Sequence, residues 1–363
     1  MLSRVGGRAT YTVWVLDEFE EAPARATRRD LRTEKKKPRW GRRILVILTA
    51  VLGLVLVAAV GYVGFLNHLA ESNTKIENML PGDNNLGSAN DPNAAPIIQG
   101  RGQNILLLGS DARPGDTFSR ADVIILAHVA DDKKNVYLVH FPRDLYVSIP
   151  GHGKNKINAA YAFGGPRLLV QTLQNLIGVK VDHVAKTDFQ GFANMTDAVG
   201  GVRVWAEEAS NGKGNGGTVV VHQGWNNFNG EQALEFVRER YELSQGDISR
   251  GRRQQAFLKA IMLKVLTPQT LTNPVTVAKL VDAGTKNLVI DQKWSVADMR
   301  SEAWDLRNLR SGNITFITAP FNGFDSVKGV GSIDVVDTSG MKNLGQMIAA
   351  DTLDQYTDVS QIP

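Results

Sequence analysis

The chain has 363 residues, with 41 Lys and Arg against 37 Asp and Glu, and it contains no cysteine. The absence of cysteine excludes disulfides, thiolate catalysis and cysteine-ligated zinc. The first 43 residues hold 12 Lys and Arg against 6 Asp and Glu, so the remaining residues have a net charge of about −2. The basic character belongs to the N-terminal arm, and we expect no nucleic acid among the partners of the later domain.

The N-terminal part of the chain has the pattern of a membrane anchor. Residues 1–43 mix charged and small residues without a sustained period and are predicted to be a mobile basic arm. Residues 44–66 are uncharged and almost wholly apolar, long enough as a helix to cross the roughly 30 Å hydrocarbon core. The Lys and Arg directly before this run predict a cytoplasmic arm in contact with membrane lipid and an extracellular remainder. A cleavable signal peptide, the alternative, would have a shorter apolar region close to Met1.

The rest of the chain divides into a linker and one domain. Residues 67–103 are rich in Asn, Asp, Gly and Pro and are predicted to be an extracellular linker spanning roughly 30 Å. From residue 104 onward, short apolar runs predict buried strands at 105–109, 122–130, 136–141, 181–187, 287–290 and 314–319. Helical periodicity lies between them, at 166–177, 230–238, 250–266 and 295–309. This alternation predicts an α/β fold, an α-β-α sandwich with a central mixed sheet, over residues 104–363.

Acidic and basic side chains cluster where the first two strands meet a loop. Gly109-Ser110-Asp111-Ala112-Arg113 ends the first strand, and Arg120-Ala121-Asp122 opens the second. Strand ends that feed loops are the usual ligand sites of open α/β sheets. Asp111 and Asp122 on neighbouring strands suit a shared Mg²⁺, which commonly binds one or two carboxylates together with phosphate oxygens. An ordinary ion pair in a loop is the alternative.

Further cations follow later strands and helices. Phe141-Pro142-Arg143-Asp144 ends a strand, with Lys156 beyond it. Arg238-Glu239-Arg240 ends the helix that begins near Gly230, and the two arginines point the same way if the chain is extended there but diverge if the helix continues. Guanidinium forks bind phosphate oxygens in pairs, so several of them with two carboxylates suit a metal pyrophosphate. Solvated arginines at a helix entry are the alternative for the last group, which comprises Asp247, Arg250, Arg252, Arg253 and Gln254.

Several common enzyme motifs are missing from the sequence. No Walker loop and no GxGxxG follows Leu108, which argues against an ATPase. The six histidines form no HExxH pair, and no GxSxG occurs, so a zinc hydrolase and a serine hydrolase both lack their motifs.

The ordered motifs of residues 102–266 resemble those of the LytR-CpsA-Psr family. They are the 104–113 run, Arg120-Ala121-Asp122, Pro142-Arg143-Asp144, Lys156-Ile157-Asn158, Asp188-Phe189-Gln190-Gly191-Phe192 and the 238–254 segment. The order of arm, membrane helix, linker and extracellular domain also resembles the layout of that family. Its members transfer glycopolymers from a polyprenyl-pyrophosphate carrier to peptidoglycan, so the resemblance implies this donor and this acceptor.

The resemblance also implies roles for individual residues. Asp111 and Asp122 are implied to hold Mg²⁺, with Mn²⁺ as a possible substitute. Arg120, Arg143 and Asp247 are implied to be catalytic. The implied pyrophosphate-binding residues are Arg113, Arg120, Arg143, Lys156, Arg238, Arg240, Arg250 and Gln254. The acceptor proton has three open routes, to Asp247, to Asp144 or through a metal-assisted path without a dedicated base.

Some residues and some functions remain alternatives. Asp188 and Asp197 are expected to cap helices and turns and not to bind ligand. The apolar faces of residues 168–177 and 257–266 are expected to be core, although a lipid channel needs similar residues. A noncatalytic protein that binds a lipid pyrophosphate, and a hydrolase that releases the polymer to water, both suit the same cations. Teichoic acid, capsule and arabinogalactan all remain open as the polymer.

Overall fold

The computed structural model describes residues 40–82, 97–110 and 121–360, and the chain divides into two compact units, Met1–Ala59 and Val60–Pro363. The first unit contains the N-terminal part of helix α1 (Trp40–Asn73). Residues Leu48–Asn73 of this helix are long and apolar enough to cross a membrane. The apolar helix predicted at 44–66 is therefore present; it enters the second unit at Val60 and continues beyond Leu66 to Asn73.

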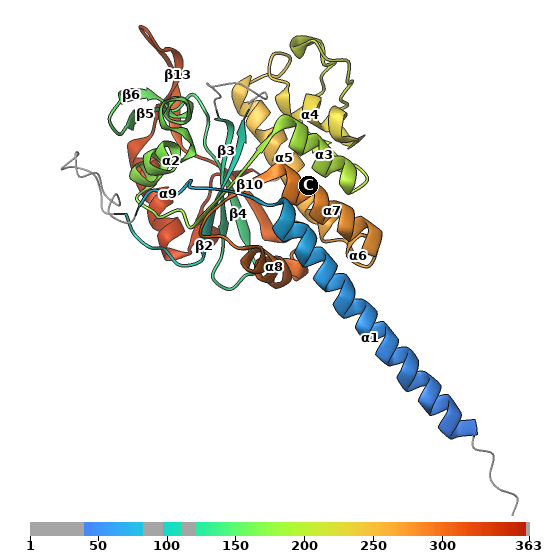
Figure 1. Ribbon diagram of the computed structural model, residues 1–363. Coiled ribbons are helices and arrows are strands. Elements are labelled where there is room, and N and C mark those ends of the chain that lie inside the picture. The colour runs from blue at the N-terminus through green and yellow to red at the C-terminus, as the bar shows by residue number, and fades with distance from the viewer. Residues whose placement is uncertain (1–39, 83–96, 111–120, 361–363) are drawn as a thin grey trace, which may run out of the picture. The chain divides into compact units, whose positions relative to one another are not determined.

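A mixed eight-stranded sheet forms the centre of the second unit, in the order β1-β10-β7-β2-β3-β4-β11-β14 (Figure 1). The pairs β1–β10, β7–β2 and β4–β11 are parallel, and the other neighbours are antiparallel. The strands are β1 (Lys75–Glu77), β2 (Gln103–Ser110), β3 (Ala121–Val129), β4 (Val136–His140), β7 (His183–Asp188), β10 (Leu288–Asp291), β11 (Ile314–Thr318) and β14 (Val359–Ser360).

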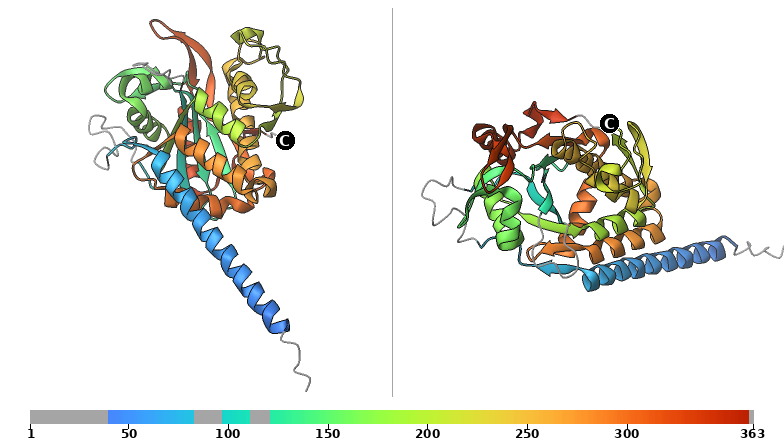
Figure 2. Two further views of the ribbon diagram at one scale, coloured as in Figure 1. Left: turned by 45° about the vertical axis from the view of Figure 1, so that its right-hand side comes forward. Right: turned by 90° about the horizontal axis from the view of Figure 1, so that it is seen from above.

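Helices cover both faces of this sheet, as Figures 1 and 2 show. One face packs against α2 (Ile157–Ile177) and α9 (Thr338–Ala350). The other face packs against α3 (Phe189–Ala198), α4 (Gly230–Arg238), α5 (Asp247–Val265) and α7 (Pro274–Asn287). Two further helices, α6 (Pro268–Leu271) and α8 (Val296–Asp305), complete the set. The predicted α-β-α sandwich with a mixed sheet is confirmed.

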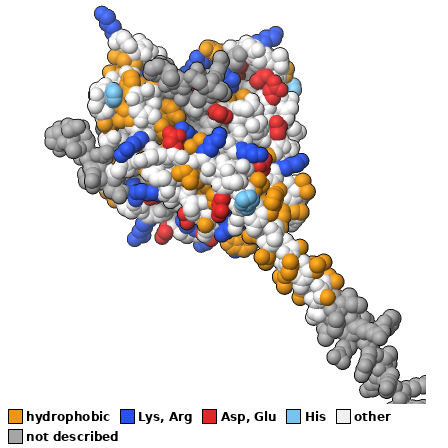
Figure 3. Space-filling model, viewed as in Figure 1, with side chains coloured by type: hydrophobic (Ala, Val, Ile, Leu, Met, Phe, Trp, Pro, Cys, Tyr) orange, Lys and Arg blue, Asp and Glu red, His pale blue; other side chains and the backbone are white. Residues whose placement is uncertain are grey.

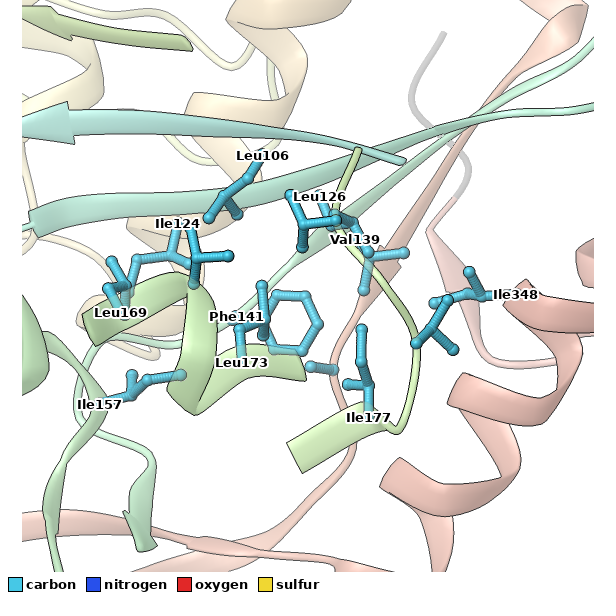
Figure 4. Close-up of a cluster of buried hydrophobic side chains, with 14 of the residues drawn as sticks. Leu106, Ile124, Leu126, Val139, Phe141, Ile157, Leu169, Leu173, Ile177 and Ile348 are labelled. Atoms are coloured by element: carbon cyan, nitrogen blue, oxygen red, sulfur yellow. The ribbon is translucent and has the colours of Figure 1, made fainter. Parts of the chain in front are cut away.

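Alternating side chains explain why the strands read as continuous apolar runs. On β2 and β3, Leu106 and Leu126 lie in the core beneath α2 and α9, which Figure 4 shows. Their sequence neighbours Ile105 and Ile125 lie in the core on the opposite face. Because a strand projects successive side chains to opposite faces, a sheet covered on both sides needs apolar residues at every position. The interpretation of residues 168–177 as core agrees with the burial of Leu169 and Leu173.

Three two-stranded hairpins lie outside the main sheet and were not predicted. They are β5 (Tyr146–Ile149) with β6 (Gly153–Lys156), β8 (Val202–Ala206) with β9 (Gly224–Phe228), and β12 (Phe321–Val327) with β13 (Gly331–Val336). A bridge between Leu145 and Asp334 joins β13 to the loop after β4. The helix predicted at 250–266 begins earlier, at Asp247. The helix predicted at 166–177 also begins earlier, at Ile157, and is interrupted at Gly164 and Gly165.

The structure corrects the predicted 67–103 linker over residues 67–82, whereas residues 83–96 lie outside the described residues. Residues 67–73 continue α1, and β1 pairs in parallel with β10 from Lys75 to Glu77. Met79 is 0% exposed and Leu80 is 5% exposed, so both side chains belong to the core. The Asn-rich and Gly-rich composition hid this because the edge strand is held by backbone hydrogen bonds, which composition does not report.

Candidate active site

Charged residues of several elements meet at one edge of the main sheet. Ser110 at the end of β2 pairs with Ala121 at the start of β3. His140 at the end of β4 pairs with Ile125, because β3 and β4 are also antiparallel. The end of β2, the start of β3 and the end of β4 therefore lie at the same edge, and the residues that follow β4 approach Asp122.

Arg143 is the centre of the charged cluster. Its Nη1 lies 2.5 Å from Oδ1 of Asp122, and its Nε lies 3.4 Å from Oδ1 of Asp247. Burial lowers the pKa of Arg143, but Asp247 and Asp122 outweigh burial and raise it above its ordinary value. The start of α2 holds the backbone at Arg143 in place, because the backbone N–H of Asn158 donates to the Arg143 carbonyl at 3.2 Å. The predicted cation after β4 and the predicted carboxylate of β3 are thus in contact.

Helix α5 brings a second arginine to the same carboxylates. Gly246 precedes the helix with φ of 54°, a conformation that suits glycine, and the helix then opens with Asp247. Nη2 of Arg250 lies 2.5 Å from Oδ1 of Asp247. Burial lowers the pKa of Arg250, and the neighbouring cations Arg143 and Arg240 lower it further. The Asp247 carboxylate is consequently shared between two guanidinium groups.

A close packing contact fixes the height of α5 above the sheet. A Cβ atom at Gly251 would lie 2.7 Å from Nδ1 and 2.9 Å from Nε2 of His140, so only glycine fits. His140 is 3% exposed, and burial together with Arg250 lowers its pKa to about 3. The neutral imidazole therefore packs directly against the helical turn that carries Arg250.

Lys156 and a buried aspartate extend the cluster on the other side. Nζ of Lys156 lies 2.9 Å from Oδ1 of Asp144. The backbone N–H of Asp334 donates to the Asp144 carbonyl at 3.0 Å. Asp334 is 5% exposed, and its pKa is raised to about 6 by burial and by the neighbouring charges of Asp144 and Asp247. The sequence did not single out Asp334, which comes from a hairpin almost two hundred positions after Asp144.

Arg238 at the end of α4 and Arg240 just after it lie in different environments. The chain is extended at Glu239, with φ of −64° and ψ of 132°, and Glu239 is buried at 2% exposure. Nη2 of Arg240 donates to the Tyr241 hydroxyl at 2.7 Å. This hydrogen bond lowers the pKa of Tyr241, and the charges of Arg143 and Arg250 contribute, so Arg240 lies near the cluster. Arg238 instead stacks on the Phe189 ring at 4.5 Å, and no contact among the described residues joins it to Arg143.

The remaining residues of α5 have structural partners. Arg252 lies 3.6 Å from Glu207, and Arg253 donates to the Glu208 carbonyl at 2.8 Å. The alternative of a solvated helix-entry arginine therefore fits Arg252, whose side chain is 33% exposed, but not Arg253, which is 4% exposed. Gln254 is 7% exposed, and its Nε2 lies 3.4 Å from the Val237 carbonyl oxygen. Gln254 thus borders the end of α4 one turn after Arg250.

Three predicted site residues, Asp111, Arg113 and Arg120, lie outside the described residues. The two aspartates expected to be caps have that role. Asp188 accepts a hydrogen bond from the Gly191 backbone N–H at 2.7 Å at the start of α3. Asp197 accepts one from the Gly230 backbone N–H at 2.7 Å at the start of α4.

The donor groups of the cluster are compatible with a magnesium ion held partly by substrate. Asp122 carries a side chain that is 20% exposed beside the cations. Within residues 40–82, 97–110 and 121–360, no group of three His, Cys, Asp or Glu is placed to hold a metal. A dedicated protein cage is therefore not indicated there, whereas one or two carboxylates combined with phosphate oxygens and water match the usual preference of Mg²⁺.

Solved structures share this architecture. The structure described as TagT bound to LI-WTA aligns with a TM-score of 0.57 and 27% identity, covering 69% of this chain and 90% of that chain. The crystal structure of Bacillus subtilis TagT aligns with a TM-score of 0.58 over 77% of this chain and 99% of that chain. The latter is 24% identical and supports the fold alone.

Curated relatives and a family model cover most of the chain. The chain is 31% identical to the Bacillus licheniformis polyisoprenyl-teichoic acid–peptidoglycan teichoic acid transferase TagU over 75% of this chain and 86% of that protein. It is 30% identical to the Corynebacterium glutamicum cell wall biosynthesis protein LcpA over 82% of this chain, but spans 63% of the length of LcpA. The model of the LytR_cpsA_psr family matches residues 64–348. The chain therefore belongs to the LytR-CpsA-Psr family.

Proposed function

We propose that this protein is a membrane-anchored phosphotransferase that moves a glycopolymer from a polyprenyl-pyrophosphate carrier to peptidoglycan. The proposal rests on the cluster of Arg143, Asp122, Asp247 and Arg250 at one sheet edge, in a family whose named relatives include a teichoic acid transferase. We also propose that α1 crosses the cell membrane with the basic arm in the cytoplasm, because Lys and Arg directly precede the apolar run.

In the proposed reaction, a sugar hydroxyl oxygen of peptidoglycan attacks the phosphorus that bears the glycopolymer. The bond from that phosphorus to the bridging pyrophosphate oxygen breaks, polyprenyl phosphate leaves, and a phosphodiester links the two polymers. Arg143, Arg250 and Arg240 neutralise the pyrophosphate and the charge that develops on the leaving group. Lys156 adds a further cation beside Asp144.

Asp122 and Asp111 would hold Mg²⁺, which when bound supplies further charge neutralisation on the phosphate oxygens. The acceptor proton passes to a carboxylate of the cluster. Both candidate carboxylates form ion pairs, Asp247 with Arg250 and Asp144 with Lys156. Either carboxylate could accept the proton directly or through one water molecule.

The test is the mass of the product formed by the full chain in detergent micelles, given a lipid-pyrophosphate-linked glycan and a peptidoglycan acceptor. We expect a covalent adduct whose mass includes one phosphate bridge. Chelation should abolish its formation, and added Mg²⁺ or Mn²⁺ should restore it. Retention of donor without an adduct would instead support a noncatalytic binding protein, and free glycan phosphate would support a hydrolase.

A matched pair of arginine variants tests the cation cluster. Arg240→Ala should reduce turnover on the order of 100-fold or more, because it removes a charge next to the reacting phosphates. Arg252→Ala removes an equal charge from the neighbouring helix, but Arg252 pairs with Glu207 away from the cluster and should retain nearly full activity. Equal activities of the two variants would contradict the proposed role of Arg240.

A further inference from the structure

Exposed apolar side chains gather near the part of α1 that belongs to the folded domain. Leu271 at the end of α6 is 48% exposed, Val275 at the start of α7 is 62% exposed, and Trp304 on α8 is 66% exposed. Figure 3 shows hydrophobic side chains on α1 and on the neighbouring surface of the domain. We call the surface formed by Leu271, Val275, Trp304 and Arg307 the basal surface.

Two hydrogen bonds join α7 to α1 and place the start of α7 beside Tyr62. The Tyr62 hydroxyl donates to the Pro274 carbonyl at 2.6 Å. Farther along both helices, Nδ2 of Asn73 donates to Oδ1 of Asp282 at 3.0 Å. The two helices therefore run in the same direction, and Pro274 at the beginning of α7 lies beside Tyr62.

Tyr62 lies inside the apolar run and not above it. The run ends at Leu66, four positions later, which corresponds to about 6 Å along a helix axis. The headgroup region on each side of the hydrocarbon core is about 5 to 8 Å thick. If residues 44–66 occupy the hydrocarbon, the corner between α6 and α7 reaches through the headgroup layer into the outer part of the hydrocarbon, and Leu271 and Val275 cannot both remain in water.

Helix α8 approaches the same level from a separate segment of the chain. Nη1 of Arg300 donates to Oδ1 of Asn67, at 2.7 Å, directly after the apolar run. Trp304 follows Arg300 by four residues and therefore lies on the same helix face. The Arg307 guanidinium stacks on the Trp304 ring at 4.5 Å. An exposed Trp beside a cation is the typical composition of side chains at a membrane interface.

We propose that the basal surface rests in the lipid headgroup layer that α1 passes through, so that the catalytic domain is held against the bilayer at a fixed height. The inference rests on the proposed membrane anchoring by α1. The occupant of the surface is the lipid bilayer itself, because the exposed apolar residues are continuous with a helix that the bilayer would already surround. The domain is then held in one orientation, with the cluster of Asp247 and Arg250 at the opposite end of α5 from the basal surface.

The lack of native cysteine allows a direct measurement of depth. Single-cysteine variants of the full chain, each labelled with an environment-sensitive fluorophore, are placed in nanodiscs of phosphatidylcholine and phosphatidylglycerol. Some of the lipids carry a nitroxide quencher near the headgroup end of the acyl chain. Val275→Cys and Asp305→Cys report on the basal surface, and both positions are exposed. Val63→Cys reports on the apolar run, and Phe324→Cys reports on a hairpin residue that is 67% exposed.

We expect the labels at 275 and 305 to be quenched at least half as strongly as the label at 63, and the label at 324 to be unaffected. If 63 is quenched while 275 and 305 behave like 324, the docking proposal is wrong and the anchoring stands. If 63 is not quenched either, both proposals are wrong.

A charge-insertion variant provides a second measurement. Val275→Glu combined with Trp304→Glu should reduce quenching at Asp305→Cys to the level of Phe324→Cys, because two carboxylates oppose insertion among the lipids. Phe324→Glu is the matched control and should leave the label at 305 unchanged. Unchanged quenching in the double variant would overturn the role of these two side chains.

Discussion

Asp334 carries a carboxyl group that is buried in the candidate site. Its pKa is raised to about 6 by burial and by the nearby charges of Asp144 and Asp247, with Lys156 and Arg143 opposing the shift. A raised carboxyl pKa means that the folded protein binds this proton more tightly than the unfolded chain does. The contribution of Asp334 to stability therefore falls as the pH rises from about 4 to about 6 and stays unfavourable above that range.

Asp334→Asn tests this linkage because it removes the ionisation and keeps the size of the side chain. At pH 8 the variant should be more stable than the parent, on the order of 2 kcal/mol. The difference should vanish below pH 4, where the parent carboxyl is protonated in both states. Thermal unfolding of the full chain across this pH range measures the effect. A constant difference at every pH would mean that the carboxyl does not titrate as described.

Glu239 lies between Arg238 and Arg240, whose side chains have different partners. Glu239 is buried and extended, and its side chain accepts a hydrogen bond from the backbone N–H of Tyr241 at 2.7 Å. Arg238 and Arg240 then flank a buried position, as a period of two requires. The extended alternative raised from the sequence is the one observed, yet only Arg240 reaches the cluster while Arg238 stacks on Phe189.

At the scale of elements, α5 carries Asp247 and Arg250, and its contacts with the main sheet fix its position. Nε2 of Gln255 donates to the Ile317 carbonyl at 3.0 Å, and Gly251 lies directly above the His140 ring. The helix therefore contacts β11 and β4 through the Gln255 amide, which also lies 3.4 Å from the Leu138 carbonyl oxygen, and through the close packing of Gly251 on His140. Its first turn, with Asp247 and Arg250, is positioned by both.

Gly251→Ala should displace this helix and lower both stability and turnover. The added methyl group would overlap the His140 ring, and overpacking of this kind costs about 1 to 3 kcal/mol. Gly284→Ala is the control, because a methyl group at Gly284 in α7 would meet no atom within 4 Å, and alanine there should stabilise by up to about 1 kcal/mol. Unfolding midpoints and turnover of the two variants give the comparison, and a stable, active Gly251→Ala variant would contradict the packing argument.

At the scale of the whole molecule, the segment after the apolar helix α1 is part of the fold. β1 adds to the edge of the main sheet beside β10, and Glu77 forms an ion pair with Lys186 of β7. Met79 and Leu80 then enter the core between α2 and the sheet. The folded domain therefore continues directly from α1, and the described residues up to Leu80 form no long flexible tether.

Met79→Ala measures this integration. Removing a fully buried methionine side chain should cost about 2 to 5 kcal/mol. Ile76→Ala is the matched control from the same segment, because Ile76 is 64% exposed and its truncation should change stability by less than about 0.5 kcal/mol. Denaturant unfolding of the two variants in the same detergent distinguishes them. Equal small effects would mean that residues 75–80 do not contribute to the core.

Much of the fold followed from local patterns. The apolar runs at 105–109 and 136–141 became β2 and β4, and the period of the 230–238 segment gave the bounds of α4. These patterns are readable because burial of a strand or a helix face imposes a period on the sequence itself. The hairpin β12–β13 escaped prediction because only two of its positions, Ile333 and Asp334, are buried and no such period is imposed.

The sequence by itself determined the apolar helix, the layered α/β architecture and the set of charged loops. Only the tertiary structure decided which charges meet: Asp122 with Arg143, Asp144 with Asp334, and Arg240 but not Arg238 near Arg250. The same holds for β1, which joins β10 across more than two hundred residues. The reason is physical, because periodicity reports how each element is buried, whereas the order and register of strands fix which distant side chains lie at one sheet edge.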